Sequence, residues 1–222
     1  MGEEVYMDFS FLGEYYMFFI NGAKFTLIIA FFSVFLGVIG GTIFALMKLS
    51  KSVILNMIAS TYVEIIRGTP VLVQLYIIFY GLPYAGLQLP DMVAGIIALS
   101  INSSAYVAEI IRGGINAVDK GQMEAARSLG MSYNRAMINI IIPQAVKTII
   151  PVLGNEFIVI IKESSIVSVI GIHELSYNAD TVRGNIFKPF EPLLISALIY
   201  FIMTFTLSKF MKRVEERMKI SD

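Results

Sequence analysis

The chain has 222 residues, 56% of them hydrophobic, and its mean hydropathy is +0.73. Soluble globular domains are about 45–50% apolar, so this composition indicates a membrane protein. The 17 basic and 17 acidic side chains cancel, which excludes a bulk electrostatic field for binding nucleic acid. The chain has no Cys and one histidine, His173, so disulfides, cysteine metal sites and clustered-histidine metal sites are excluded.

Five apolar segments predict five membrane-spanning helices, because each is long enough to cross ~30 Å of hydrocarbon. In the first segment, Gly37 and Gly41 form a small-xxx-small pair, which predicts close packing against another helix. The second is interrupted by Gly-Thr-Pro, the third by Asn-Ser-Ser, and the fourth contains Pro151 and Gly154. The predicted spans are 25–47, about 53–80, about 92–111, about 143–165 and about 192–209.

The distribution of Lys and Arg predicts an N-terminus outside and a C-terminus in the cytosol. Loop 81–90 has no basic residue, and the other predicted outer segment has only Arg183 and Lys188. That second outer segment, about 166–191, is long and mixed in character, so we expect it to fold partly back over the outer face. The predicted inner segments carry the remaining basic clusters, which are Lys48 and Lys51; Arg112, Lys120, Arg127 and Arg135; and Lys209, Lys212, Arg213, Arg217 and Lys219.

The polar segment between the third and fourth spans has the signature of a well-defined short helix. Asp119 is a favourable N-cap, and Gln122 follows it by three residues. Apolar residues then recur at helical spacing, and Gly130 supplies the positive φ that ends such a helix. A membrane protein has little need of so defined a helix in a loop unless a partner docks there. The alternative is a solvated surface helix.

Charged residues within the predicted spans indicate either local ion pairs or a functional cavity, because an isolated charge there costs roughly 2.5–3.5 kcal/mol. Glu64 and Arg67 lie three residues apart and are predicted to pair along one helical face. Glu109 and Arg112 have the same spacing and the same prediction.

The fourth span carries charges that local pairing does not explain. Glu156 and Lys147 lack an obvious partner nearby in sequence. Lys162 and Glu163 are neighbours, so their side chains point about 100° apart and do not neutralise each other along one face. Lys162 can extend outward to water and leave Glu163 facing a cavity, with the hydroxyls of the two following serines beside it.

Three spans therefore place hydroxyl, amide or freed backbone groups near one depth. Pro70 frees a carbonyl of the preceding turn, and irregular backbone at this depth is tolerated where it lines a wet cavity. A zwitterionic solute needs such groups for its carboxylate, and Glu163 for its ammonium or guanidinium. The alternative is interhelical hydrogen bonding, worth ~0.6 kcal/mol for each bond. The candidate solute site comprises Gly68, Thr69, Pro70, Asn102, Ser103, Ser104, Glu163 and Ser164.

Three long segments resemble the permease subunits of polar amino acid ABC importers. They are EIIRGTPVLVQL (64–75), SSAYVAEIIRGGINAVDKGQMEAARSLG (103–130) and IIPQAVKTIIPVLGNEFIVIIKESSIVSVIG (141–171). The resemblance implies an all-α type I importer fold with five transmembrane helices, one permease domain over 1–222 and a cytosolic coupling helix at 119–130. The residues it implies for ATPase coupling are Asp119, Gly121, Glu124, Ala125, Ala126, Leu129 and Gly130.

The resemblance also implies a location in the cell membrane of a prokaryote and a set of partner proteins. These are a second permease subunit (identical or a sister chain), two cytosolic ATPase subunits and an extracytoplasmic solute-binding protein. The chain has no G-x-x-x-x-G-K-[ST] phosphate loop, so ATP and Mg²⁺ are expected on the ATPase and no cofactor is expected here. The chain is accordingly expected to be a transport subunit and not an enzyme. The carboxylate of Glu163 favours a basic amino acid (arginine, lysine or histidine), with glutamine next.

Three other functions fit parts of the pattern. A secondary carrier would use Glu64, Glu109 or Glu163 as a proton relay, but it would often show two repeated halves, and none is visible. A membrane-embedded enzyme would need clustered His or acidic residues at metal-ligand spacing. A structural scaffold would explain the packing glycines but not the polar groups at one depth.

Overall fold

The computed structural model describes residues 7–219, so both ends of the predicted 1–222 domain lie outside the described residues. Within that range the chain is helical and has no strands. Four helices are long and apolar enough to cross a membrane, and the bent α2–α3 pair makes a fifth span if counted as one. The elements are α1 (Leu12–Leu49), α2 (Val53–Gly68), α3 (Val71–Tyr84), α4 (Asp91–Asn116), α5 (Lys120–Ser128), α6 (Tyr133–Ala136), a π-helical turn (Met137–Ile141), α7 (Ile142–Glu163), a 3₁₀ helix (Ser164–Ile170), α8 (Leu175–Ile186) and α9 (Glu191–Lys219).

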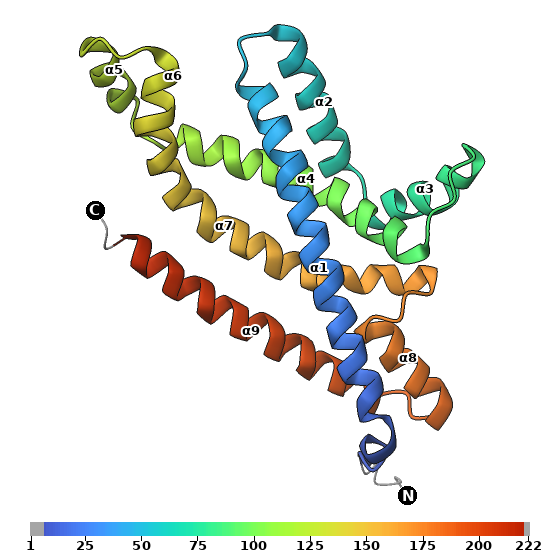
Figure 1. Cartoon of the computed structure of the whole chain (residues 1–222). Helices are drawn as coiled ribbons and strands as arrows, with labels where there is room; N and C mark the ends of the chain where they lie inside the picture. The colour runs from blue at the N-terminus through green and yellow to red at the C-terminus, as the bar shows by residue number, and fades with distance from the viewer. Residues whose placement is uncertain (1–6, 220–222) are drawn as a thin grey trace, which may run out of the picture.

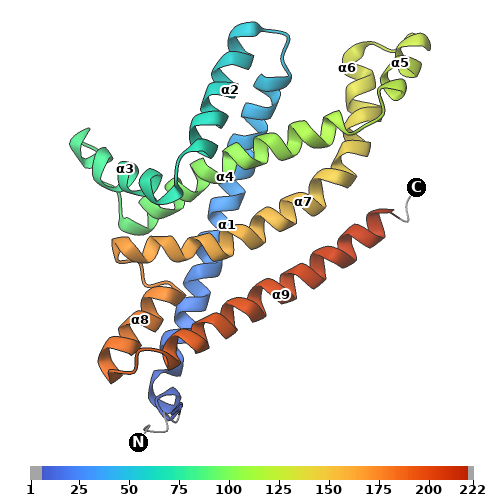
Figure 2. The same cartoon turned by 180° about the vertical axis from the view of Figure 1, so that it is seen from behind.

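Figure 1 shows how these helices are arranged around α1, which α4 and α7 cross on their way through the molecule. The small helices α5 and α6 form the tip of a separate arm, where α4 arrives and α7 leaves. Helix α8 lies near the N-terminal part of α1, far from that arm, as the reverse view in Figure 2 also shows. The arm that carries α5 and α6 and the helix α8 thus lie at opposite ends of the molecule.

The first and last spans are longer than hydropathy predicts. Helix α1 begins at Leu12 instead of residue 25, and α9 continues to Lys219 instead of ending near 209. Hydropathy marks only the part of a helix that suits lipid. The added part of α9 continues as helix because Glu, Lys, Arg and Met have high helix propensity. The added part of α1 is mostly apolar and packs against α8, with Phe19 in one buried cluster with Leu175 and Ala179.

The predicted interruption of the third span is wrong, because α4 is continuous through Asn102, Ser103 and Ser104. Ser104 donates its hydroxyl to the Ile101 carbonyl of its own helix at 2.8 Å. Asn102 and Ser103 donate to side chains of other helices. Each polar group therefore has a partner that leaves the helical backbone intact.

The fourth span belongs to a continuous helical run, Tyr133–Ile170, of which the predicted 143–165 is the central part. A π-helical turn at Met137–Ile141 ends two residues before Pro143. Proline has no N–H and its ring crowds the carbonyl four residues earlier, so a locally widened turn relieves the conflict.

The glycines of α1 allow it to contact α4 closely, as their spacing predicts. A Cβ atom added to Gly37 would lie 2.9 Å from Cβ of Ser103, and one added to Gly41 would lie 2.6 Å from Cβ of Val107. Real Cβ atoms do not approach so closely. The α1–α4 contact therefore depends on glycine at both positions.

The segment 166–191 folds back as α8 against the N-terminal part of α1 and against α9. Its N-cap, Glu174, is fully buried and accepts hydrogen bonds from the Tyr200 hydroxyl at 2.7 Å, the Tyr177 N–H at 2.7 Å and the Thr26 hydroxyl at 3.4 Å. Burial raises the pKa of the Glu174 carboxyl above its ordinary value. His173 is exposed and stacks on the Tyr177 ring. The buried carboxyl of Glu174 thus joins α1, α8 and α9.

Candidate solute site and coupling helix

The predicted break in the second span is a sharp elbow, with 105° between the axes of α2 and α3. Thr69 has an extended backbone (φ −119°, ψ 145°), and Pro70 forms the N-cap of α3. Proline disfavours the helical conformation in the residue before it and has no N–H to continue the helical ladder. The Gly-Thr-Pro sequence is therefore sufficient to end one helix and begin another.

A buried amide, Gln74, holds the elbow together. Its Nε2 donates to the Ile66 carbonyl at 2.7 Å, to the Thr69 carbonyl at 3.1 Å and to the Thr69 hydroxyl oxygen at 2.9 Å. Its Oε1 accepts from Asn102 Nδ2 of α4 at 3.0 Å. Sequence reasoning did not select Gln74. The available signal was one amide in the otherwise apolar run Val71–Leu75.

Two predicted site residues therefore take part in the elbow. The Thr69 hydroxyl gives its hydrogen to the Ile65 carbonyl at 2.9 Å, and Asn102 is buried against Gln74. Gly68 and Pro70 are exposed on either side of the bend. These four predicted site residues thus belong to the bend or bond to it, and none of them lines the cavity that Glu163 borders.

The two serines of α4 lie between helices. Ser103 donates to Glu156 Oε1 of α7 at 2.9 Å, which gives that carboxylate the partner its own helix lacks. Ser104 shares a 2.7 Å hydrogen bond with the Tyr62 hydroxyl of α2. Both serines are buried. Lys147, the other charge of this span without an obvious partner in sequence, lines a cavity of ≈ 340 Å³ together with Glu215 of α9. Its side chain does have an interaction partner in the structure.

Glu163 is half-buried and borders an open cavity of ≈ 400 Å³ beside the elbow. Lys162 borders the same cavity, is exposed, and does not pair with Glu163 in any ion pair found within residues 7–219. Ser164 is buried and donates to the Ile161 carbonyl at 2.8 Å, so its hydroxyl serves the end of α7. The cavity lining is Val71, Val159, Lys162, Glu163, Ser165 and Ile166.

The N-terminus of α3 faces this cavity through Val71. Val73 and Gln74 donate their N–H groups to the Pro70 carbonyl, whereas the N–H groups of Val71 and Leu72 precede the first helical acceptor. Such groups and the helix dipole favour a negative charge. The first residue of α3 and the Glu163 carboxylate therefore border the same cavity.

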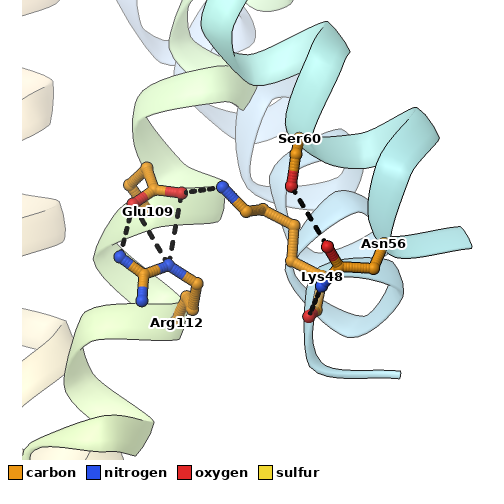
Figure 3. Close-up of polar contacts among 5 residues, drawn as sticks. All are labelled: Lys48, Asn56, Ser60, Glu109 and Arg112. Atoms are coloured by element: carbon orange, nitrogen blue, oxygen red, sulfur yellow. Dashed lines mark hydrogen bonds and ion pairs between the residues drawn. The ribbon is translucent and has the colours of Figure 1, made fainter. Parts of the chain in front are cut away.

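The predicted Glu109–Arg112 pair is confirmed at 2.7 Å, and the structure adds a third member. Figure 3 shows Lys48 extending from the end of α1 to the same carboxylate, at 2.6 Å. Asn56 of α2 donates to the Lys48 carbonyl, and Ser60 donates to Asn56 Oδ1. This cluster joins α1 and α2 to the end of α4 that leads into α5.

The predicted Glu64–Arg67 pair is not among the ion pairs found in residues 7–219. The Arg67 guanidinium lies over the Tyr106 ring of α4, 5.3 Å from its centroid. Spacing of three residues permits an ion pair but does not require one, and an aromatic face on a neighbouring helix is a competing partner for arginine.

The predicted coupling helix is present as α5. Asp119 Oδ1 accepts from the Gly121 N–H at 2.6 Å, which confirms the N-cap. Gly130 has φ +87°, and Met131 N–H donates to the Ala126 carbonyl at 3.1 Å, so the helix ends in a Schellman motif. Ala126 is buried against the rest of the chain, whereas Leu129 is 86% exposed. Glu124 and Ala125 are also exposed, so α5 presents a free face.

A family model described as "binding-protein-dependent transport system inner membrane component" matches residues 33–220. The chain belongs to this family. It is 41% identical over 217 residues to the arginine transport system permease protein ArtQ of Bacillus subtilis, covering 97% of this chain and 99% of that one. It is 39% identical over 215 residues to a probable glutamine ABC transporter permease protein, GlnM, of the same organism, covering 97% and 100%.

A solved structure resembles this permease over nearly its whole length. The crystal structure of an amino acid ABC transporter with histidines superposes with a TM-score of 0.92, at 52% identity, over 96% of this chain and 100% of that one. The chain is therefore a multi-pass membrane permease subunit of an amino acid ABC transporter, with the type I importer fold, and it is not itself an enzyme.

Proposed function

We propose that this permease forms the translocation pathway of an ATP-driven importer for basic amino acids, with glutamine as the next candidate. The observation that carries the proposal is the cavity beside the elbow, which Glu163 and Val71, the first residue of α3, both line. Similar permeases support the same solute range. ArtQ is named for arginine and GlnM for glutamine, and the similar crystal structure is of a transporter with histidines.

The cavity offers each end of an amino acid a suitable partner. The free N–H groups at the start of α3 would receive the α-carboxylate, because a helix N-terminus carries partial positive charge. Glu163 would receive the guanidinium or ammonium of the side chain. Broken spans whose half-helix N-termini bind substrate carboxylates near the midplane are an established device of transporters. A neutral amide side chain would gain less from Glu163, which places glutamine second.

In the proposed assembly, two permease subunits enclose the pathway and each docks one cytosolic ATPase through α5. The exposed face of α5, with Glu124, and the exposed C-cap Leu129 would fit a cleft on the ATPase. ATP-driven closure of the two ATPases would move the α5 helices and rock the spans from an outward-open to an inward-open state. A solute-binding protein would deliver amino acids to the opposite face, where α8 lies, with the N-terminus of the chain outside and its C-terminus in the cytosol.

The test is ATPase and uptake activity of the chain co-purified with its ATPase and reconstituted in liposomes. Amino acids are screened with and without the solute-binding protein. We expect stimulation by arginine, lysine or histidine, and at least a tenfold weaker apparent affinity in Glu163→Gln. Glu64→Gln is the matched control, since Glu64 is exposed on α2 and does not border the cavity.

Two outcomes would overturn parts of the proposal. Stimulation by glutamine alone, unaffected by Glu163→Gln, would remove the basic-solute assignment. Uptake driven by a proton gradient without ATP, and lost in Glu64→Gln, would favour the carrier function instead.

A further inference from the structure

The elbow between α2 and α3 leaves backbone acceptors without helical partners beside the solute cavity. The chain turns by 105° after Gly68, so the last carbonyls of α2 lose the donors that a continuous helix would provide. Pro70 has no N–H to offer in their place. Lipid offers no donor either, so the protein must supply one.

Gln74 supplies these donors from the first turn of α3. Its Nε2 lies within hydrogen-bonding distance of the Ile66 carbonyl and of both oxygens of Thr69. The Thr69 hydroxyl directs its own hydrogen to Ile65, so all three neighbours act as acceptors and fix which end of the amide is nitrogen. The side chain is 6% exposed, and the next residue, Leu75, is fully buried in the core, so Gln74 has little freedom to move.

The other end of the amide joins the elbow to α4. Gln74 Oε1 accepts from Asn102 Nδ2 at 3.0 Å, and both residues are buried. Helix α4 is the most buried of the candidate spans, so it provides a rigid reference for the elbow. The same side chain therefore closes the bend and attaches it to the centre of the molecule.

The position of the cavity gives this connection a function. Val71 begins α3 and borders the cavity with Glu163, only three residues before Gln74. We propose that Gln74 is a positioning residue of the solute site, which fixes the free N–H groups of α3 relative to Glu163 so that carboxylate and cation are bound together. This role rests on the proposed function, because it is defined by the amino acid that the cavity would hold.

The test compares two ligands that differ only in the group that α3 would bind. Arginine and agmatine share a guanidinium and an ammonium, but agmatine lacks the carboxylate. Binding of radiolabelled arginine, and its competition by agmatine, are measured on the complete permease–ATPase complex in nanodiscs without the solute-binding protein. We expect the wild type to prefer arginine by more than tenfold, and Gln74→Leu to reduce that preference at least fivefold.

The ratio separates positioning from a loss of folding. A purely structural defect lowers binding of both ligands equally and leaves the ratio unchanged, which would overturn the proposal. Asn102→Leu keeps the hydrogen bonds within the elbow but detaches it from α4. Asn102→Leu is expected to reduce the preference for arginine over agmatine at least twofold. It tests the proposal if the Gln74→Leu complex does not assemble. Ser100→Ala is the matched control, since among the described residues the buried Ser100 hydroxyl bonds only within α4, to the Ile96 carbonyl.

A failure of the proposed function would give a different result from a failure of the role proposed for Gln74. If the wild type does not bind arginine, or if Glu163→Gln binds it with unchanged affinity, the solute assignment fails whatever Gln74 does. A different result would overturn only the role of Gln74. In that case the wild type prefers arginine and Glu163→Gln weakens arginine binding, but Gln74→Leu and Asn102→Leu keep the wild-type preference for arginine over agmatine.

Discussion

Three buried or partly buried carboxylates have partners on other helices. Glu109 at the end of α4 is neutralised by Lys48 of α1, Glu156 of α7 accepts from Ser103 of α4, and Glu174 accepts from α1 and α9. Buried charge without such partners would cost several kcal/mol. Glu163 differs, because the cavity beside it leaves its carboxylate accessible to a solute.

The buried carboxyl of Glu174 predicts a pH dependence of stability. Its pKa is raised above the ordinary 4.5, so its contribution is complete below pH 4.5 and is lost as the pH rises through the raised value. Glu174→Gln is uncharged at every pH and keeps groups able to bond Tyr200 and Tyr177. We therefore expect the Tm of the wild type, relative to Glu174→Gln, to fall as the pH is raised from 4.5 to 8.

Thermal unfolding of the detergent-solubilised complex across this pH range would measure the difference. The control is Asp180→Asn, because Asp180 is exposed and pairs with Arg183 along α8. Parallel pH curves for wild type and Glu174→Gln would show that Glu174 does not titrate differently on folding.

The cluster in Figure 3 predicts unequal roles for its two cations. Lys48 of α1 reaches Glu109 of α4, and their side chains are 14% and 19% exposed. Arg112 lies on the same helix as Glu109, and its side chain is 37% exposed. Lys48→Met should destabilise the protein by about 1–3 kcal/mol, and Arg112→Met by about 0.5 kcal/mol. Thermal unfolding in low salt would compare them. An equal or larger effect of Arg112→Met would contradict the ranking.

At the scale of elements, short sequence signals define where helices end. The Gly-Thr-Pro sequence makes the elbow, Pro143 accompanies a π-helical turn, and Asp119 and Gly130 mark the two ends of α5. Each signal works through backbone geometry, so each is local and visible in sequence. The closeness of α1 and α4 likewise follows from glycines that leave space for a neighbour.

Gly130 is predicted to be required for coupling because of its conformation. Its φ is +87°, and a Cβ atom there would meet nothing within 4 Å, so a substitution strains the backbone without a steric clash. Gly130→Val should abolish most ATP-driven uptake while changing the Tm of the complex little. Gly130→Asn is the matched control, since asparagine tolerates positive φ, and it should keep most activity.

A second variant tests the surface of the same helix. Glu124 is exposed on α5, so Glu124→Lys should leave folding intact and disrupt docking of the ATPase, measured as loss of co-purification or of stimulated ATP hydrolysis. Wild-type uptake in both Gly130→Val and Glu124→Lys would show that α5 is not the coupling element.

For the whole molecule, the separation of α5 from α8 predicts their placement on opposite sides of the membrane. The chain has no Cys, so single cysteines can be introduced without background. In intact cells, a membrane-impermeant maleimide should label Asn185→Cys of α8 but not Ser128→Cys of α5, and inverted vesicles should give the reverse. The wild type is the unlabelled control. Labelling of both variants from one side would refute their placement on opposite sides, and the reversed pattern would refute the N-out, C-in orientation.

The sequence alone predicted the membrane class, the break at Gly-Thr-Pro and the short helix α5 with its N-cap and its glycine stop. These features depend on hydropathy and backbone conformation, which are encoded within short segments such as 25–47 and 119–130. It also indicated Glu163, because neighbouring residues on a helix point apart and Lys162 therefore does not cover it.

Only the tertiary structure decided how the remaining polar residues are used. Asn102, Ser103 and Ser104 suggested a break in α4, yet each bonds to a partner supplied by helix packing or by the preceding turn. Gln74 and Glu174 drew no attention in sequence, and each joins helices that are distant along the chain. A polar side chain within an apolar span must find a partner, but which helix provides it depends on how the spans pack, and no local pattern contains that information.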